Sequence, residues 1–195
     1  MAHVEIVTER LTLRRFRAED LPAFVAYRAT PETARHQSWE PTYGMADAQA
    51  FLAEQRAVAF GVPGAWVQLA AVDRASGELC GDCAVRVRAD QPATAEIGVT
   101  LAPGHQGRGL AREALAAVVA TLFADHGMHR VYAETDDRNA PVHRVLERLG
   151  FRCEARLVEA DWFKGEWTTV RIHALLAREY PGWESNPHVP KDSGF

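Results

Sequence analysis

The residues best suited to chemistry lie in the run Gln106-Gly107-Arg108-Gly109-Leu110-Ala111, between a strand-like and a helix-like segment. The first N–H groups of a helix have no partner inside it, and the helix dipole adds positive charge there, so these groups bind phosphate. Glycine lets the backbone approach a ligand closely and adopt φ angles that are costly for other residues. The run therefore predicts an anion-binding loop. Gln106 would brace it or donate to the ligand, and Arg108 and Arg112 would add positive charge.

Two well-known phosphate-binding patterns do not fit this loop. It does not end in Gly-Lys-Ser/Thr, and it lacks the full G-x-G-x-x-G, so it is neither a Walker loop nor a dinucleotide fingerprint. An ordinary loop that enters a core helix has the same glycine spacing. The elements on either side must therefore decide between the two interpretations.

Hydrophobic periodicity predicts the elements that position the loop. Alternation from Thr94 to Leu101 gives a strand before it, with Glu96 and Thr100 on one face. Helical spacing gives a helix from about 109 to 126 after it, and Asn139 caps a second helix. Further strands are predicted near 10–14, 66–73, 79–88, 131–135, 152–161 and 167–176, and further helices after Asp20 and over 47–60.

This order of elements predicts an α/β chain (α+β by layer). Its core would be one mixed, mainly antiparallel sheet of about six to seven strands, flanked by helices. We expect one domain over residues 1–180. Residues 181–195 are rich in Pro, Gly and polar residues and are expected to form a mobile or partner-docked tail.

The composition is that of an ordinary globular protein and argues against several classes. Of 195 residues, 47% are hydrophobic and 25% charged, and a net charge of −4 does not suit a nucleic-acid partner. No window approaches the roughly 18 apolar residues of a membrane span, and the first residues lack a secretory pattern. Cys80 and Cys83 form a C-x-x-C in a strand-like context, which is typical of small buried thiols. These points predict a cytoplasmic protein with no metal and no membrane partner.

Three stretches together resemble the GCN5-related N-acetyltransferase (GNAT) superfamily. They are Glu96 to Leu101, Gln106 to Ala111, which matches the Gln/Arg-x-x-Gly-x-Gly/Ala signature, and Asn139 to Phe151. The phrases Thr8 to Arg14 and His129 to Glu134 are similar to the RimJ/RimL branch of ribosomal-protein N-terminal acetyltransferases. The resemblance covers about residues 5 to 176 and implies a GNAT-like fold.

The resemblance also implies the substrates and the donor site. The donor would be acetyl-CoA or another acyl-CoA, and the acceptor an amine. The backbone from Gln106 to Ala111, which includes Leu110, would contact the pyrophosphate. The backbone of Val99 and Leu101 would pair with the pantetheine arm, and Asn139 would approach that arm from the opposite side. A plain N-cap role for Asn139 is compatible with this.

Acyl transfer to an amine requires a neutral nitrogen and a donor for the developing oxyanion. An α-amine with a pKa of about 8 is roughly one-tenth neutral at pH 7, whereas a lysine amine is far less so. Glu96 is the leading candidate base, directly or through water, and an exposed or ion-paired structural carboxylate is the alternative. The N–H of Val99 or Thr100 is the expected oxyanion donor.

The acceptor side is expected in the segment between Pro31 and Pro41. In this segment, His36 and Glu40 could bind or deprotonate an amine. Trp39 could form an apolar wall or belong to the core.

The chain departs from the family pattern at one place. Related enzymes often have Ser three residues after the Asn, or Tyr farther along that helix, near the leaving thiolate. Those positions are Val142 and Leu146 here, and neither can donate a proton. His143 is displaced by about 100° around the helix. We therefore expect catalysis without a side-chain acid on this helix.

Three functions remain open at this point. The first is acetyl transfer to a peptide N-terminus, which demands least of a base. The second is transfer to a small amine of the aminoglycoside or polyamine type, and the third is a non-catalytic acyl-CoA-binding module. A homodimer formed through the last strands or the tail is a further hypothesis.

Overall fold

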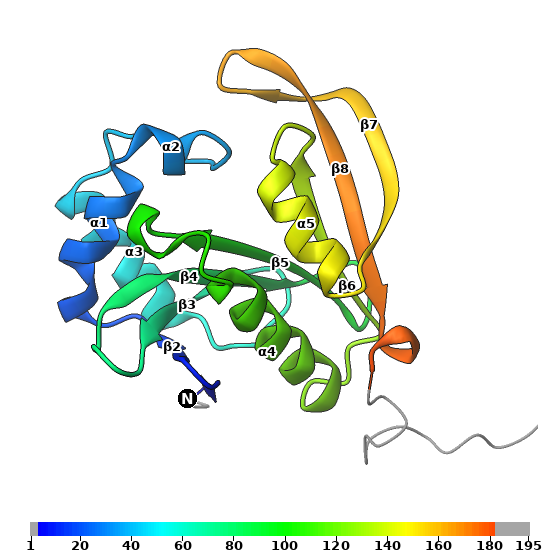
Figure 1. Ribbon diagram of the computed structural model, residues 1–195, viewed down its shortest axis with the longest axis horizontal. Helices are drawn as coiled ribbons and strands as arrows, with labels where there is room; N and C mark the ends of the chain where they lie inside the picture. Colours follow the sequence, from blue (N-terminus) through cyan, green and yellow to red (C-terminus); the bar gives the residue numbers. More distant parts are fainter. Residues whose placement is uncertain (1–3, 182–195) are drawn as a thin grey trace, which may run out of the picture.

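A computed structural model describes residues 4–181 of the chain (Figure 1). The strands are β1 (Glu5–Val7), β2 (Leu11–Arg15), β3 (Trp66–Asp73), β4 (Leu79–Val87), β5 (Thr94–Leu101), β6 (Arg130–Asp136), β7 (Arg152–Phe163) and β8 (Glu166–Leu176). The helices are α1 (Leu21–Arg28), α2 (Pro31–Ala34), α3 (Met45–Ala57), α4 (Leu110–Ala124) and α5 (Ala140–Arg148), with short 3-10 turns η1 (Ala18–Asp20), η2 (Pro103–His105) and η3 (Ala177–Glu179).

One sheet of eight strands forms the centre of the molecule, in the order β1-β2-β3-β4-β5-β6-β8-β7. Neighbouring strands are antiparallel except for β5 and β6, which run parallel. The predicted class and the mixed, mainly antiparallel sheet are thus confirmed, with one strand more than expected. The additional strand is β1, whose three residues are too few to show an alternating pattern. The tail predicted over 181–195 lies, from residue 182 onward, outside the described residues.

Each face of the sheet is covered by a different set of helices. On β3, Leu69 and Ala71 belong to the core that contains the apolar side chains of α4 and α5, whereas Ala70 and Val72 belong to a second core with α1 and α3. This follows from strand geometry, because successive side chains point to opposite faces. We refer to the two sides as the α4 face and the α1 face (Figure 1).

The strands β5 and β6 pair over only three residues and then separate. The pairs are Thr94 with Arg130, Ala95 with Val131, and Glu96 with Tyr132. Both strands continue for several residues beyond the last pair. Backbone groups on both sides therefore face an opening in the sheet, which we call the β5–β6 gap. Since β5 leads through η2 into the glycine loop, the loop lies toward the open end of this gap (Figure 1).

The predicted elements agree closely with the structure near the gap. The bounds of β3 and β5 are those expected from alternation, and α4 is two residues shorter at its C-terminal end than the predicted helix. Among residues 4–181, no helix has the length and apolar character needed to cross a membrane.

Candidate functional site

The glycine loop has the backbone geometry of an anion site. Gly109 is the N-cap of α4 with φ 79° and ψ 2°, and Gly107 has φ 72°, both in the left-handed region that favours glycine. Residues 106–109 are exposed. Within the described part of the chain, the N–H groups of Gly107 to Ala111 have no hydrogen-bond acceptor. Free donors at the positive end of a 15-residue helix suit a phosphate group.

Residues far away in the sequence hold this loop in place. Gln106 Nε2 donates to the last carbonyl of β5 at 3.0 Å, so the glutamine is a brace. Arg10 Nη1 donates to the Arg108 carbonyl at 2.9 Å, and Arg10 Nε pairs with Glu113 in the first turn of α4 at 2.6 Å. The Thr8 hydroxyl donates to the same carboxylate at 2.6 Å. The segment before β2 therefore fixes both the loop and the start of α4.

The hydrogen bonds between β4 and β5 determine which backbone groups of β5 face the gap. The Arg88 N–H donates to the Thr94 carbonyl, and the Ala102 N–H donates to the Cys80 carbonyl, both at 2.8 Å. Backbone groups alternate in direction along an antiparallel strand. The even-numbered residues of β5 therefore bond to β4, and the odd-numbered residues point their N–H and C=O groups toward β6.

This alternation separates the candidate backbone donors. Val99 and Leu101 point their N–H groups into the gap, which is the orientation that pairing with an extended ligand requires. The Thr100 N–H instead lies in the β4 ladder, opposite Asp82. The expectation that Thr100 could supply its N–H to an oxyanion is therefore wrong for this strand register, whereas Val99 keeps that capacity.

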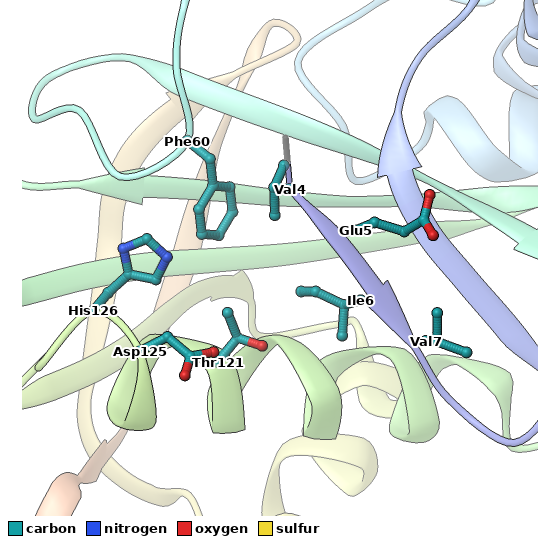
Figure 2. Close-up of a pocket in the computed structure, with 8 residues that line it drawn as sticks. All are labelled: Val4, Glu5, Ile6, Val7, Phe60, Thr121, Asp125 and His126. Carbon is teal, nitrogen blue, oxygen red and sulfur yellow. The ribbon is translucent and has the colours of Figure 1, made fainter. Parts of the chain in front are cut away.

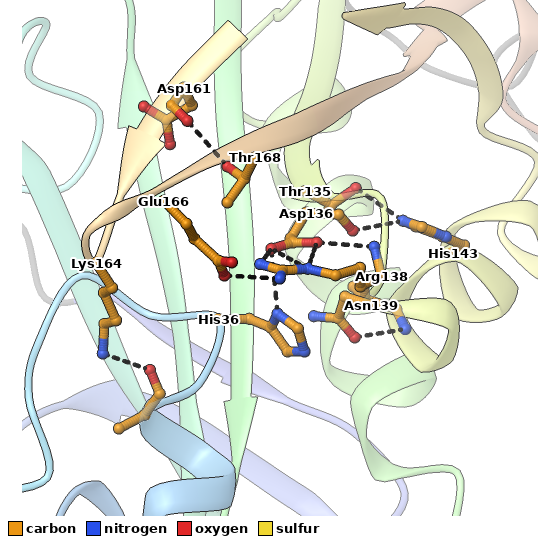
Figure 3. Close-up of polar contacts among 12 residues, drawn as sticks. His36, Thr135, Asp136, Arg138, Asn139, His143, Asp161, Lys164, Glu166 and Thr168 are labelled. Carbon is orange, nitrogen blue, oxygen red and sulfur yellow. Dashed lines mark hydrogen bonds and ion pairs between the residues drawn. The ribbon is translucent and has the colours of Figure 1, made fainter. Parts of the chain in front are cut away.

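Asn139 caps α5 close to the end of β6 (Figure 3). Its Oδ1 accepts a hydrogen bond from the Val142 N–H at 3.5 Å. Val142 packs against the core of the α4 face, and Leu146 belongs to that core. The two positions that lack a proton donor are thus occupied by packed aliphatic side chains.

His143 lies on the buried side of α5. Its Nε2 lies 3.1 Å from the Thr135 hydroxyl and 3.1 Å from the Asp136 carbonyl. Its ring stacks on that of His173, which is fully buried, with centroids 5.1 Å apart. His143 is therefore part of the packing between α5, β6 and β8.

Glu96 lies on the α1 face beside the last β5–β6 pair. It is only 8% exposed, and its Oε2 accepts hydrogen bonds from Arg86 Nη2 and, at 3.1 Å, from the Tyr132 hydroxyl. The ion-paired alternative considered for this carboxylate is thus the one observed. Two residues beyond Tyr132 on the same face, Glu134 is exposed, and it was not among the predicted site residues.

The segment that follows α2 is tied to the hairpin of β7 and β8 (Figure 3). At the hairpin turn, Lys164 Nζ donates to the carbonyls of Ala34 at 2.9 Å and Trp39 at 2.6 Å. It also lies 3.6 Å from the exposed carboxylate of Glu40. The hairpin and the predicted acceptor segment therefore meet over the α1 face.

The three residues predicted for the acceptor side have different environments. His36 Nδ1 lies 3.5 Å from a carboxylate oxygen of Asp136 at the end of β6, so this histidine does reach the gap. Trp39 instead covers the guanidinium of Arg28, whose carbon lies 3.7 Å from the centre of the indole ring. Its Nε1 donates to the Arg28 carbonyl at 3.2 Å. Glu40 is held at the surface by the hairpin.

Other residues at the site come from strands distant in the sequence. Arg86 and Lys164 lie in no motif, and the phrase that contains Tyr132 does not indicate its contact with Glu96. Their roles arise only from strand register and from the reach of the hairpin. Glu134 has a sequence signal that went unused. It follows Tyr132 at the period of two that places both side chains on one face.

Other notable features of residues 4–181 lie away from the β5–β6 gap. A hollow of about 400 Å³ lies between β1 and the end of α4, where Phe60 and His126 face it (Figure 2), and it contains none of the residues at the gap. Cys80 and Cys83 are buried as predicted, and burial raises the pKa of both thiols, so they are poor nucleophiles. Cys153 is exposed. Residues 4–181 contain no group of three or more His, Cys, Asp or Glu that could hold a metal.

Comparisons with known proteins place this geometry in context. The family model described as "Acetyltransferase (GNAT) domain" matches residues 10–152. An uncharacterized N-acetyltransferase, p20 of Bacillus licheniformis, is 28% identical over 177 residues, which cover 91% of this chain and 98% of that protein.

Two solved structures share the fold. Spermidine N-acetyltransferase from Vibrio cholerae, in complex with CoA and spermine, has a TM-score of 0.76 at 21% identity, covering 89% of this chain and 99% of that one. The ribosomal L7/L12 alpha-N-protein acetyltransferase RimL, in complex with coenzyme A, has a TM-score of 0.77 at 18% identity, covering 89% of this chain and 98% of that one.

Proposed function

Because the chain belongs to the acetyltransferase (GNAT) family, we propose that it transfers the acetyl group of acetyl-CoA to the N-terminal amine of a peptide. The chain is an N-acetyltransferase, so a non-catalytic binding module no longer accounts for it. The observation that carries the proposal is the β5–β6 gap, which runs from an exposed loop of free N–H groups to a carboxylate-bearing strand pair. The family's CoA-bound members support acetyl-CoA as the donor.

The donor site follows from the free backbone groups. We propose that the N–H groups from Gly107 to Ala111 bind the pyrophosphate, that Gln106 braces the loop, and that Arg108 contributes charge from its exposed side chain. Val99 and Leu101 would bind the pantetheine arm in the manner of a neighbouring strand, and Asn139 would approach it from α5. The Val99 N–H is then the donor for the charge that develops on the thioester carbonyl oxygen.

The preference for an α-amine rests on the bases around the gap. Arg86 and Tyr132 both donate to Glu96, so the leading predicted base is already bound, and the side chain of His36 lies 3.5 Å from a carboxylate oxygen of Asp136. A carboxylate is a weak base, so a site that relies on one suits an amine that is already partly neutral at pH 7, and an α-amine meets this condition far better than a lysine. RimL, as an alpha-N-protein acetyltransferase, is in line with this acceptor, whereas the spermidine enzyme represents the alternative.

A comparison of acceptors tests the proposal. Acetyl-CoA would be supplied with peptides that carry a free N-terminus, with lysine peptides whose N-terminus is blocked, and with spermine or an aminoglycoside. Release of free thiol and the mass of the product would be measured. We expect turnover with the free N-termini and one acetyl group on the α-nitrogen. Turnover with the polyamine alone would overturn the peptide assignment and leave acetyl transfer intact.

Gly98 offers a direct probe of the acceptor side. It lies on the α1 face, level with Glu134 across the gap, and an added Cβ would meet nothing nearer than the Ala84 Cβ at 3.9 Å. We expect Gly98→Val to fold with an unchanged melting temperature and unchanged CoA affinity. Its kcat/KM for the acceptor should fall about tenfold or more, because the new side chain occupies space beside the reacting groups. An unchanged acceptor kcat/KM would argue against an acceptor on this face.

A further inference from the structure

Two carboxylates on adjacent strands flank the point where the sheet opens. Glu96 is paired with Tyr132 in the last β5–β6 bridge, so Gly98 and Glu134 are the next residues on the α1 face of each strand. Gly98 has no side chain, which leaves Glu134 facing the space beside the Val99 N–H. A nitrogen attacking a carbonyl bound at Val99 from the α1 face would therefore pass next to Glu134.

The two carboxylates differ sharply in their partners. Arg86 and Tyr132 both donate to the same oxygen of Glu96. These two bonds occupy the lone pairs of Oε2 and fix the orientation of the carboxylate. Glu134, by contrast, has no hydrogen bond or ion pair with any residue from 4 to 181, and its side chain is exposed. It is the carboxylate that remains free to accept a proton.

Charges from three neighbouring segments reach Glu134. Although the side chain reaches the surface, neighbouring atoms partly shield its carboxylate from water. This desolvation and then the negative charge of Glu96 raise the pKa of Glu134, while Arg86 and Arg88 lower it and Asp161 on β7 raises it further. The two arginines are already paired, Arg86 with Glu96 and Arg88 with Asp90. The raised pKa brings the carboxylate closer to the range in which general bases are effective near neutral pH.

We propose that Glu134 is the general base of the reaction and that Glu96, fixed by Arg86 and Tyr132, is a positioning residue that keeps a negative charge beside it. The inference rests on the proposed acetyl transfer. It assigns different roles to two neighbouring carboxylates: Glu134, which is free, exchanges the proton, and Glu96, which is bound, raises the basicity of Glu134.

In this reaction the acceptor nitrogen loses two protons and the C–S bond of the donor breaks. Glu134 takes one proton from the acceptor's ammonium group and later releases it to water. The nitrogen lone pair then forms the N–C bond as the C–S bond breaks, and that bond's electron pair leaves on sulfur. The second proton lost by nitrogen ends on the thiolate through solvent. This route is consistent with the aliphatic Val142 and Leu146 on α5.

The test compares Glu134→Gln, Glu96→Gln and a control, Glu54→Gln, an exposed residue on α3. Each variant would be assayed with acetyl-CoA and a free N-terminal peptide across pH 6 to 9, and CoA affinity would be measured by calorimetry. For Glu134→Gln we expect unchanged CoA affinity and a kcat/KM for the peptide about 100-fold lower at pH 7. The deficit should shrink as the pH approaches the pKa of the amine.

The pH profile separates the two roles. Loss of the negative charge in Glu96→Gln should move the acidic limb of the profile to lower pH and leave the rate at pH 8 within a few-fold of the original. A Glu134→Gln variant with the original profile, or a Glu96→Gln variant that alone loses turnover, would overturn the assignment and leave the proposed function standing. If the unmodified protein released no thiol with any amine, both would fail.

Discussion

Replacing both Gly107 and Gly109 with valine is expected to weaken coenzyme A binding about 100-fold while the protein remains folded. Both glycines have φ angles near 75°, and a left-handed backbone costs other residues about 1–2 kcal/mol each. In the free variant the loop is expected to relax out of this costly shape, so its N–H groups no longer converge on one anion. Coenzyme A binding must then restore the shape, which costs about tenfold in affinity for each substitution.

Calorimetric titration with coenzyme A measures this effect. Gly127→Val is a matched control, because Gly127 also has a positive φ of 60° and nothing within 4 Å of an added Cβ, yet it lies beyond the opposite end of α4. The control should lose stability and keep its affinity. If the double variant bound coenzyme A as tightly as the original protein, the phosphate site would have to lie elsewhere.

Mild acid is expected to destabilise the protein through the stacked pair His143 and His173. Burial lowers the pKa of both imidazoles. The positive charge of Arg171 lowers the pKa of His143 further, and the neighbouring His143 ring lowers that of His173 further. Glu147 opposes the shift for both rings, and Asp136 and Asp137 also oppose it for His143. In residues 4–181, neither nitrogen of His173 has a hydrogen-bond partner. The folded state therefore favours two neutral rings.

The sign of the effect follows from proton binding. Below the ordinary histidine pKa of about 6.5, the two histidines bind protons in the unfolded chain but remain neutral in the folded state. The free energy of unfolding therefore falls as the pH falls. The loss is at most about 1.4 kcal/mol per pH unit for each histidine, and it ends once the pH falls below the lowered pKa of the folded state. Above pH 7, this contribution is fully present and constant.

Urea unfolding at pH 7.5, 6 and 5 checks the expectation. His173→Phe removes one titrating group and should reduce the acid sensitivity by about half, since a single histidine then remains. His129→Gln, a change at an exposed histidine, should leave the sensitivity unaltered. Equal acid sensitivity in His173→Phe and the original protein would show that other groups control it.

Local patterns were sufficient to predict the elements around the gap. Alternation gave the bounds of β5, and the glycines before a helical stretch gave the loop, because both features depend on residues close together in the sequence. Even the direction of the Val99 side chain follows from the period of two. The three-residue strand β1 was too short for such a pattern.

What the sequence could not supply was the register between distant segments. The Glu96–Tyr132 contact joins residues 36 apart, and Arg10 reaches Arg108 across 98 positions. The exclusion of the Thr100 N–H likewise depends on which β5 residues bond to β4. No periodicity within one segment determines which residues of two distant segments lie side by side. The sequence alone therefore left several candidates for the base and two for the oxyanion donor, Val99 and Thr100.

The three-pair junction between β5 and β6 has a consequence for the mechanics of the whole domain. It is the only direct strand pairing between β1–β5 and β6–β8 in the described sheet. Along the described sheet, the two halves are therefore joined by only three residue pairs, and a donor that bonds to β5 and also meets α5 would add a further link between them. Ligand binding of this kind stabilises the folded state by about 2.7 kcal/mol at a concentration 100 times the dissociation constant. Acetyl-CoA would thus stabilise the folded domain of the enzyme as well as donate the acetyl group.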